Sequence, residues 1–127
     1  MCAEDRSVYL WSIFGPAEVD TYGLNEGRTY CDILKIPSAR YDAVSCFVSL
    51  EHCIDPALIV KAACQALTPK GLFVASVPAV DGVLDVKPHH TWYWAGWSLQ
   101  RMLKCNGFSV FASLEYANIL YVLSTRA

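Results

Sequence analysis

Apolar residues along the chain fall into short blocks separated by glycine, proline and charged positions. Six blocks are dense in β-branched or aromatic residues and bounded by turn-forming residues, a pattern that predicts strands. These blocks are residues 7–14, 28–36, 41–48, 72–78, 108–116 and 118–125. The block 41–48 is apolar almost throughout, which is typical of a strand buried on both faces of a parallel sheet. The last two blocks are joined by Ala117 alone, and so short a connection predicts an antiparallel hairpin.

After the block 41–48, apolar residues recur at the spacing of a helix. Asp55 is a good N-cap, and Pro56 suits the first helical position. Beyond them, apolar residues recur at helical intervals and predict one buried face: Leu58, Ile59, Ala62, Ala63, Ala66 and Leu67. Pro69 cannot continue the helix and Gly71 permits a turn, so the helix is expected to end before them.

A second helix is predicted over residues 99–106, with Ser98 as its cap and Gly107 just past its end. The segment 79–97 before it has no clear period, although it carries two histidines and three tryptophans. Helices that alternate with strands, followed by an antiparallel pair, predict an α/β protein. The length of the chain suits a single domain over residues 1–127.

The composition is unusually apolar for a chain of 127 residues. Apolar residues make up 54% of it, against a usual share of about 45–50%, and charged residues only 17%. We therefore expect a sheet buried on both faces, or a surface that docks onto a partner in a homo-oligomer or a hetero-complex. The net charge of −2 lacks the basic excess typical of proteins that bind nucleic acid, so a nucleic-acid partner is not expected.

The distribution of charge and cysteine indicates a compartment. The first residues, "MCAEDRS", are charged rather than apolar, which does not fit a signal peptide. No apolar run approaches the ~20 residues of a membrane-spanning helix. The six cysteines form no C-x-x-C pair, and several lie in apolar segments where a free thiol behaves as a small hydrophobe. We expect a cytoplasmic protein with reduced thiols and no membrane partner.

Three stretches, taken in order, resemble class I S-adenosylmethionine-dependent methyltransferases: "CDILKIPSARYDAVSCFVSLEHCIDP", "ALTPKGLFVASVP" and "HHTWYWAGWSLQRMLKCNGFSV". The resemblance covers about residues 28–125. In such families an acid ends the third strand, "LEH" follows the fourth, a proline–glycine turn precedes the fifth, and "GF" precedes a final hairpin. The resemblance implies a Rossmann-like α/β sheet, abbreviated and mostly parallel, with a C-terminal antiparallel hairpin. It also implies S-adenosylmethionine as the cofactor.

The sequence departs from these families in the half that binds the cofactor. Their first motif is a glycine-rich turn, whereas "SIFGPAEVD" holds Gly15 alone with Pro16 behind it. Too few residues separate Gly15 from Asp32 for the helix, strand and second helix of a complete first half, given helices of ~11 residues. The cofactor half is therefore expected to be degenerate or absent.

The resemblance implies a cofactor site at the carboxyl ends of the strands, where parallel sheets bind ligands. The residues expected to contact the cofactor are Gly15, Asp20, Asp32, Ile33 and Phe47. Adenosine is expected against Asp32 and Ile33, because a carboxylate accepts hydrogen bonds from the adenine amino group or the ribose hydroxyls. The methionine end is expected near Gly15 and Phe47. Asp20 is an alternative ribose ligand, and Asp32 could instead be a turn-capping acid.

The acceptor side is expected where "LEH" leaves its strand. The resemblance implies His52 as the general base. Three further residues are expected to contact the substrate: Glu51, His90 and Trp92. The simpler alternatives are a polar strand exit and a packed aromatic loop. Related families hold a metal with "E-x-x-E-H", but here Val48 replaces the first glutamate, so no metal is expected.

Two functions fit these patterns. One is a compact methyltransferase that binds S-adenosylmethionine and transfers its methyl group to an unidentified small-molecule or protein acceptor. The other is a non-catalytic methyltransferase-like subunit, a pseudoenzyme or fragment, that docks onto a partner. The retained Asp32 and "LEH" favour the first, and the turn with a single glycine favours the second. The sequence does not identify the acceptor, because acceptor pockets in this fold are built from variable loops.

Overall fold

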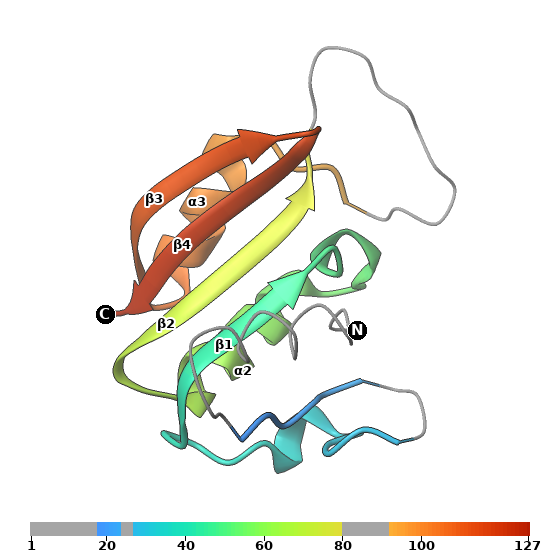
Figure 1. Cartoon of the computed structure of the whole chain (residues 1–127), viewed down its shortest axis with the longest axis vertical. Helices are drawn as coiled ribbons and strands as arrows, with labels where there is room; N and C mark the ends of the chain where they lie inside the picture. The colour runs from blue at the N-terminus through green and yellow to red at the C-terminus, as the bar shows by residue number, and fades with distance from the viewer. Residues whose placement is uncertain (1–17, 24–26, 80–91) are drawn as a thin grey trace.

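A computed structural model describes residues 18–23, 27–79 and 92–127. Its elements, in chain order, are η1 (Ile33–Lys35), β1 (Tyr41–Phe47), η2 (Leu50–His52), α2 (Pro56–Ala66), β2 (Leu67–Pro78), α3 (Gly96–Cys105), β3 (Phe108–Tyr116) and β4 (Ile119–Arg126). The strands form one sheet, and α2 and α3 lie on the same side of it (Figure 1). No helix in these described segments is long and apolar enough to cross a membrane.

The strand order of the sheet is β1-β2-β4-β3. β1 and β2 are parallel and joined by the crossover through α2, whereas β4 is antiparallel to both β2 and β3. The predicted pairing of strands 41–48 and 72–78, with the hairpin beyond them, is therefore confirmed. The expectation of a mostly parallel sheet is wrong for the described strands. The tight turn after β3 returns β4 between β3 and β2, so antiparallel pairings outnumber the parallel one. The strand predicted over residues 7–14 lies outside the described residues.

The predicted strand over residues 28–36 is also wrong. Tyr30 makes one isolated bridge to Tyr22, and the chain then turns through the short helix η1. Asp32 causes this turn, because its carboxylate accepts a hydrogen bond from the Leu34 N–H at 3.0 Å and so offers the backbone a local partner in place of a strand.

α2 begins as the sequence predicts. The Asp55 carboxylate accepts a hydrogen bond from the Leu58 N–H at 3.2 Å, and Pro56 opens the first turn. The buried face differs from the predicted one and consists of Pro56, Val60, Ala63 and Ala66. Leu58, expected in the core, is 48% exposed, because the stripe that starts at Pro56 and recurs every three or four residues faces the sheet.

α3 begins at Gly96, three residues before the predicted start. Ser98 therefore lies in the first turn and not at the cap. Its hydroxyl accepts a hydrogen bond from the Ala95 N–H at 3.1 Å and donates one to the Ala95 carbonyl at 2.9 Å. Gly107 follows the helix with a φ of +94°, which confirms the predicted C-terminal glycine.

The predicted C-terminal hairpin is confirmed, although its turn is longer than expected. Ala117 and Asn118 both have positive φ, at +50° and +61°, as a type I′ turn requires. Tyr116 and Ile119 face each other across this turn and set the register of β3 against β4.

The core lies between the sheet and the two helices. Its main members are Cys46, Val60, Phe73, Ala75, Val77, Leu99, Leu103, Phe108, Leu120 and Val122. The rings of Phe73 and Phe108 stack with centroids 4.8 Å apart and join β2 to the start of β3. β2 is packed against this core and β1 is paired to β2, so the position at which the chain leaves the carboxyl end of β1 is fixed relative to the core.

Candidate functional site

The chain leaves the carboxyl end of β1 through a tight, hydrogen-bonded turn. Val48 has a φ of +47°, which is rare for a β-branched residue. Its N–H donates to the carbonyl and the hydroxyl of Ser76, at 2.9 Å and 3.2 Å. The Ser49 hydroxyl donates to the Phe47 carbonyl at 2.9 Å. These bonds hold η2 against β2, so its two ionisable residues lie on a fixed backbone.

Glu51, in η2, is buried without a hydrogen-bond partner. Its side chain is 1% exposed, and neither carboxylate oxygen accepts a hydrogen bond. His52 lies beside it, with Nε2 3.6 Å from Oε1 of Glu51. Burial raises the pKa of the Glu51 carboxyl, and the residue's own backbone N–H and, less strongly, the imidazole of His52 oppose this shift. A buried carboxylate without a hydrogen bond is costly for a fold, and such groups cluster at sites that bind ligands or move protons.

The segment after the undescribed residues 80–91 returns to this turn. The Trp92 N–H donates to the Glu51 carbonyl at 3.2 Å, and the Trp92 ring stacks on Trp94 with centroids 5.9 Å apart. Trp94 is buried, and its indole N–H also lacks a partner. The structure thus brings together Glu51, His52 and Trp92 at the carboxyl end of β1. Two buried polar groups there, the Glu51 carboxylate and the Trp94 indole N–H, make no hydrogen bond.

The structure places Asp20 at the other end of β1. Its carboxylate accepts a hydrogen bond from the Tyr41 hydroxyl at 2.6 Å, and Tyr41 is the first residue of the strand. Burial, and after it the hydrogen bond to Asp20, raises the pKa of Tyr41. Because seven strand residues span roughly 20 Å, Asp20 does not meet the Glu51 turn.

Asp32 and Ile33 also lie apart from this turn. The short helix η1, drawn in cyan below β1 in Figure 1, is separated from the arrowhead of β1, where η2 begins. Asp32 is exposed and its carboxylate serves the backbone of η1, which matches the turn-capping alternative. Phe47 is the last residue of β1 and leads directly into the Glu51 turn. Gly15 and His90 lie outside the described residues.

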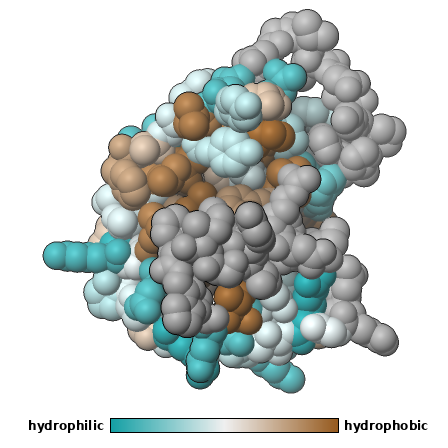
Figure 2. Space-filling view, viewed as in Figure 1, coloured by the Kyte–Doolittle hydropathy of each residue, from teal (hydrophilic) through white to brown (hydrophobic). Residues whose placement is uncertain are grey.

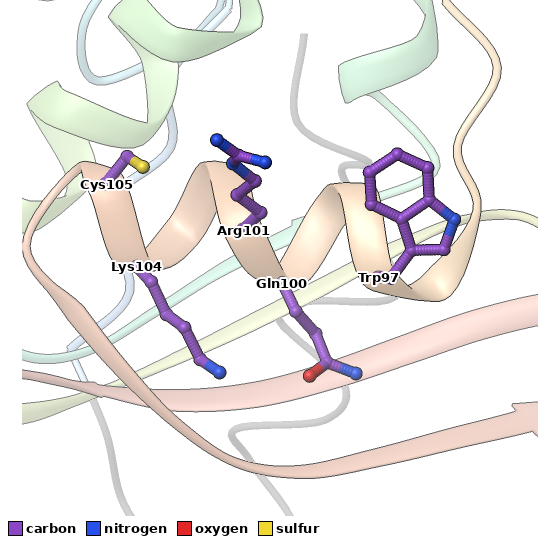
Figure 3. Close-up of a pocket in the computed structure, with 5 residues that line it drawn as sticks. All are labelled: Trp97, Gln100, Arg101, Lys104 and Cys105. Carbon is purple, nitrogen blue, oxygen red and sulfur yellow. The ribbon is translucent and has the colours of Figure 1, made fainter.

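A groove on α3 was not anticipated from the sequence. It has a volume of about 440 Å³ and is lined by Trp97, Gln100, Arg101, Lys104 and Cys105 (Figure 3). The signal was present, because Trp97, Arg101 and Lys104 recur at helical spacing and Trp97 is 72% exposed. All five residues belong to one helix, so the groove is a shallow surface feature and we assign it no role in catalysis.

The described residues offer no cluster suited to a metal ion. Across residues 18–23, 27–79 and 92–127, no three or more histidine, cysteine, aspartate or glutamate side chains converge as ligands. The chemistry available at the end of β1 is instead that of a carboxylate and an imidazole, which accept protons and hydrogen bonds.

Comparison with known proteins shows which family the sequence matches and which solved structures share its fold. A family model described as a methyltransferase domain matches residues 11–120. No curated protein matches the sequence significantly. Among solved structures, Burkholderia thailandensis 1,6-didemethyltoxoflavin-N1-methyltransferase, with 1,6-didemethyltoxoflavin and S-adenosylhomocysteine bound, superposes with a TM-score of 0.78 at 16% identity. That match covers 94% of this chain and 65% of the enzyme.

Two further structures share the fold. A methyltransferase in complex with the Trm112 activator of Haloferax volcanii has a TM-score of 0.65 at 12% identity, over 72% of this chain and 57% of that one. A SAM-dependent methyltransferase from Aquifex aeolicus has a TM-score of 0.62 at 13% identity, over 73% of this chain and 50% of that one. The chain therefore spans between half and two thirds of the length of these structures.

Proposed function

The chain belongs to the methyltransferase domain family, and from this premise we propose that it transfers a methyl group from S-adenosylmethionine to an acceptor bound beside η2. The observation that carries the proposal is the buried, unpartnered carboxylate of Glu51 beside His52, at the carboxyl end of β1. Ligands of parallel α/β sheets bind outside these strand ends, so this is where an unpaired polar group has a functional use.

The carboxylate at this turn suits the positively charged methionine end of S-adenosylmethionine. An unpaired carboxylate binds cations and hydrogen-bond donors, and the ammonium, sulfonium and hydroxyl groups of the cofactor are of these kinds. Glu51 and the neighbouring Phe47 would hold the charged end. The acids expected for adenosine and ribose each have a local role, because Asp20 is bonded to Tyr41 and Asp32 caps η1. We therefore leave both out of the proposed site.

His52 is suited to remove a proton from the acceptor. S-adenosylmethionine, when bound, supplies a methyl group that is already activated, so the protein must mainly align the acceptor and accept its proton. The His52 side chain is partly exposed, and the Glu51 carboxylate beside it would stabilise the imidazolium that forms. Trp92, fixed to Glu51 through its backbone, would provide one wall for the acceptor. Once an acceptor is known, His52→Ala should reduce turnover by roughly 10²-fold or more.

The fluorescence of Trp92 offers a test that needs no acceptor. Titration with S-adenosylhomocysteine should change the tryptophan emission in a saturable way. The change should be largely lost in Trp92→Phe and kept in the matched control Trp97→Phe, because Trp97 lies exposed on α3. An equal loss in the two variants, or no change in the parent chain, would contradict the site.

A non-catalytic methyltransferase-like subunit is the second candidate. One observation favours it: the acids expected for adenosine are used locally, by the Tyr41 hydroxyl and the backbone of η1. The two functions differ in one result, because a subunit that only docks onto a partner would show no saturable binding of either form of the cofactor.

We also propose that the protein forms a homo-oligomer or a hetero-complex and acts in the cytoplasm. Its apolar composition supports assembly, and one protein of the same fold, the methyltransferase solved with Trm112, is seen in a complex. The compartment is supported by the described cysteines, which are not joined to one another by disulfides, as suits reducing conditions.

A further inference from the structure

β3 is the outermost strand of the sheet on the side away from β1. Residues 111–116 of this strand are all exposed, with Leu114 at 62% and Tyr116 at 71%. Proteins commonly protect such an edge with proline, lysine or a bulge. Here a bulge between Val110 and Ala112 interrupts the start of β3, but residues 112–116 pair regularly with β4 and contain neither proline nor lysine.

The same residues contribute to an apolar surface on the side of the sheet opposite the helices. Directly opposed residues of an antiparallel pair share a face, so the register of β3 and β4 defines this surface. Its members are Ala112, Leu114 and Tyr116 from β3, and Leu123, Tyr121 and Ile119 from β4. We call these six residues the open face. Their neighbours Leu120 and Val122 point into the core.

No residue of the open face carries a charge. Figure 2 looks onto this side of the sheet and shows hydrophobic surface gathered toward the β3 and β4 end. A surface without charge can lie beside a copy of itself, because no like charges meet where the two open faces adjoin. The described residues 18–23 and 27–40 approach the sheet at β1, the other edge, so they do not compete for β3 (Figure 1).

The register of β3 also permits self-pairing. Tyr116 and Ile119 close the hairpin turn as a hydrogen-bonded pair, and backbone direction alternates along a strand, so the N–H and C=O of Ser113 point outward. An antiparallel two-fold axis at Leu114 sets Ser113 opposite the partner's Glu115. The same axis sets the small Ala112 opposite the partner's bulky Tyr116. Glu115, the single charge of residues 112–116, then faces a serine and not its own copy.

We propose that two copies of this chain associate through β3, edge to edge and antiparallel, with the two-fold axis at Leu114 and the open faces continuous across the dimer. The pairing buries an exposed apolar strand end and adds backbone hydrogen bonds between the copies. The partner is a second copy and not a different protein, because the edge is complementary to itself in size and charge.

Sedimentation velocity between about 1 and 100 µM tests the proposal. The parent chain should show a concentration-dependent dimer. Leu114→Lys sets two lysines against each other at the axis and should weaken the dimer about 10-fold or more. Leu34→Lys, a control on the exposed side chain in η1 near the other edge, should leave it unchanged. A parent chain that stays monomeric at about 100 µM, or equal effects of the two lysines, would overturn the proposal.

Hydrogen exchange provides a second test that uses the parent chain alone, so its result does not depend on whether a variant folds. The Ser113 amide should exchange more slowly at high than at low protein concentration, because only the dimer pairs it. An exchange rate that does not depend on concentration contradicts the β3 interface. Neither measurement involves the cofactor, so this proposal and the proposed methyl transfer can fail separately.

Discussion

Among single residues, Glu51 gives a prediction about how stability depends on pH. Burial raises the pKa of its carboxyl above the ordinary value of 4.5. The folded protein therefore holds this proton more tightly than the unfolded chain. As pH rises above 4.5, the unfolded chain loses the proton first, so the free energy of unfolding falls with pH over this window. Urea denaturation of the parent and Glu51→Gln should show the variant gaining stability relative to the parent from pH 4.5 to neutrality. A difference that stays flat or reverses would contradict the burial of this carboxylate.

The sequence indicated part of this picture and could not indicate the rest. The acid and the histidine at a strand exit were visible in "LEH", and so was the capping role of Asp55. The burial of Glu51 was not, because local sequence does not show which distant segments pack around a side chain; the backbone of Trp92, for example, bonds to the Glu51 carbonyl from 41 residues along the chain. The bonds of Asp20 and Asp32 were likewise hidden, since an acid can serve a hydroxyl, a backbone amide or a ligand with the same local sequence.

At the scale of elements, the start of β2 depends on a glycine with little room. A Cβ added to Gly71 would lie 2.8 Å from Cδ2 of Leu67 and 3.0 Å from the Thr68 carbonyl oxygen. Gly71→Ala should therefore destabilise the fold by about 1–3 kcal/mol, as overpacked sites do. Gly96→Ala is the matched control, because its Cβ would approach nothing closer than 3.9 Å at the start of α3. It should be neutral or stabilise by up to about 1 kcal/mol. Thermal melts that rank the two variants in the opposite order would show that β2 begins differently.

The sequence correctly predicted the elements that are determined by residues close together in the chain. β1, the capped start of α2, and the β3–β4 hairpin follow from apolar runs, an aspartate–proline pair and a short turn. The segment 28–36 has a strand-like composition yet turns at η1, because a strand also needs a neighbour to pair with, and its pairing is limited to one bridge. The buried face of α2 was misplaced for a similar reason, since several stripes were apolar and only packing chose among them.

For the whole molecule, the order β1-β2-β4-β3 leaves two different ends. One carries the turn with Glu51 and His52, and the other carries the exposed strand β3. The sequence predicted β1 beside β2 and the hairpin beyond β2, because the crossover and the hairpin each permit few arrangements, but it did not predict which hairpin strand pairs with β2. It overestimated the parallel share, since the hairpin places β4 between β2 and β3. The proposed cofactor site at one end of β1 therefore lies apart from the proposed dimer surface along β3.

We propose that this chain of 127 residues binds S-adenosylmethionine beside Glu51. Isothermal titration of S-adenosylmethionine into the purified chain tests this proposal, with Asp32→Ala titrated alongside. We expect saturable binding with one cofactor per chain, and an affinity in Asp32→Ala that matches the parent because this acid serves η1. A 10- to 150-fold loss in Asp32→Ala, the loss of about 1.5–3 kcal/mol expected for a charge-assisted hydrogen bond, would return the adenosine site to Asp32. No measurable heat up to about 1 mM cofactor would contradict the claim outright.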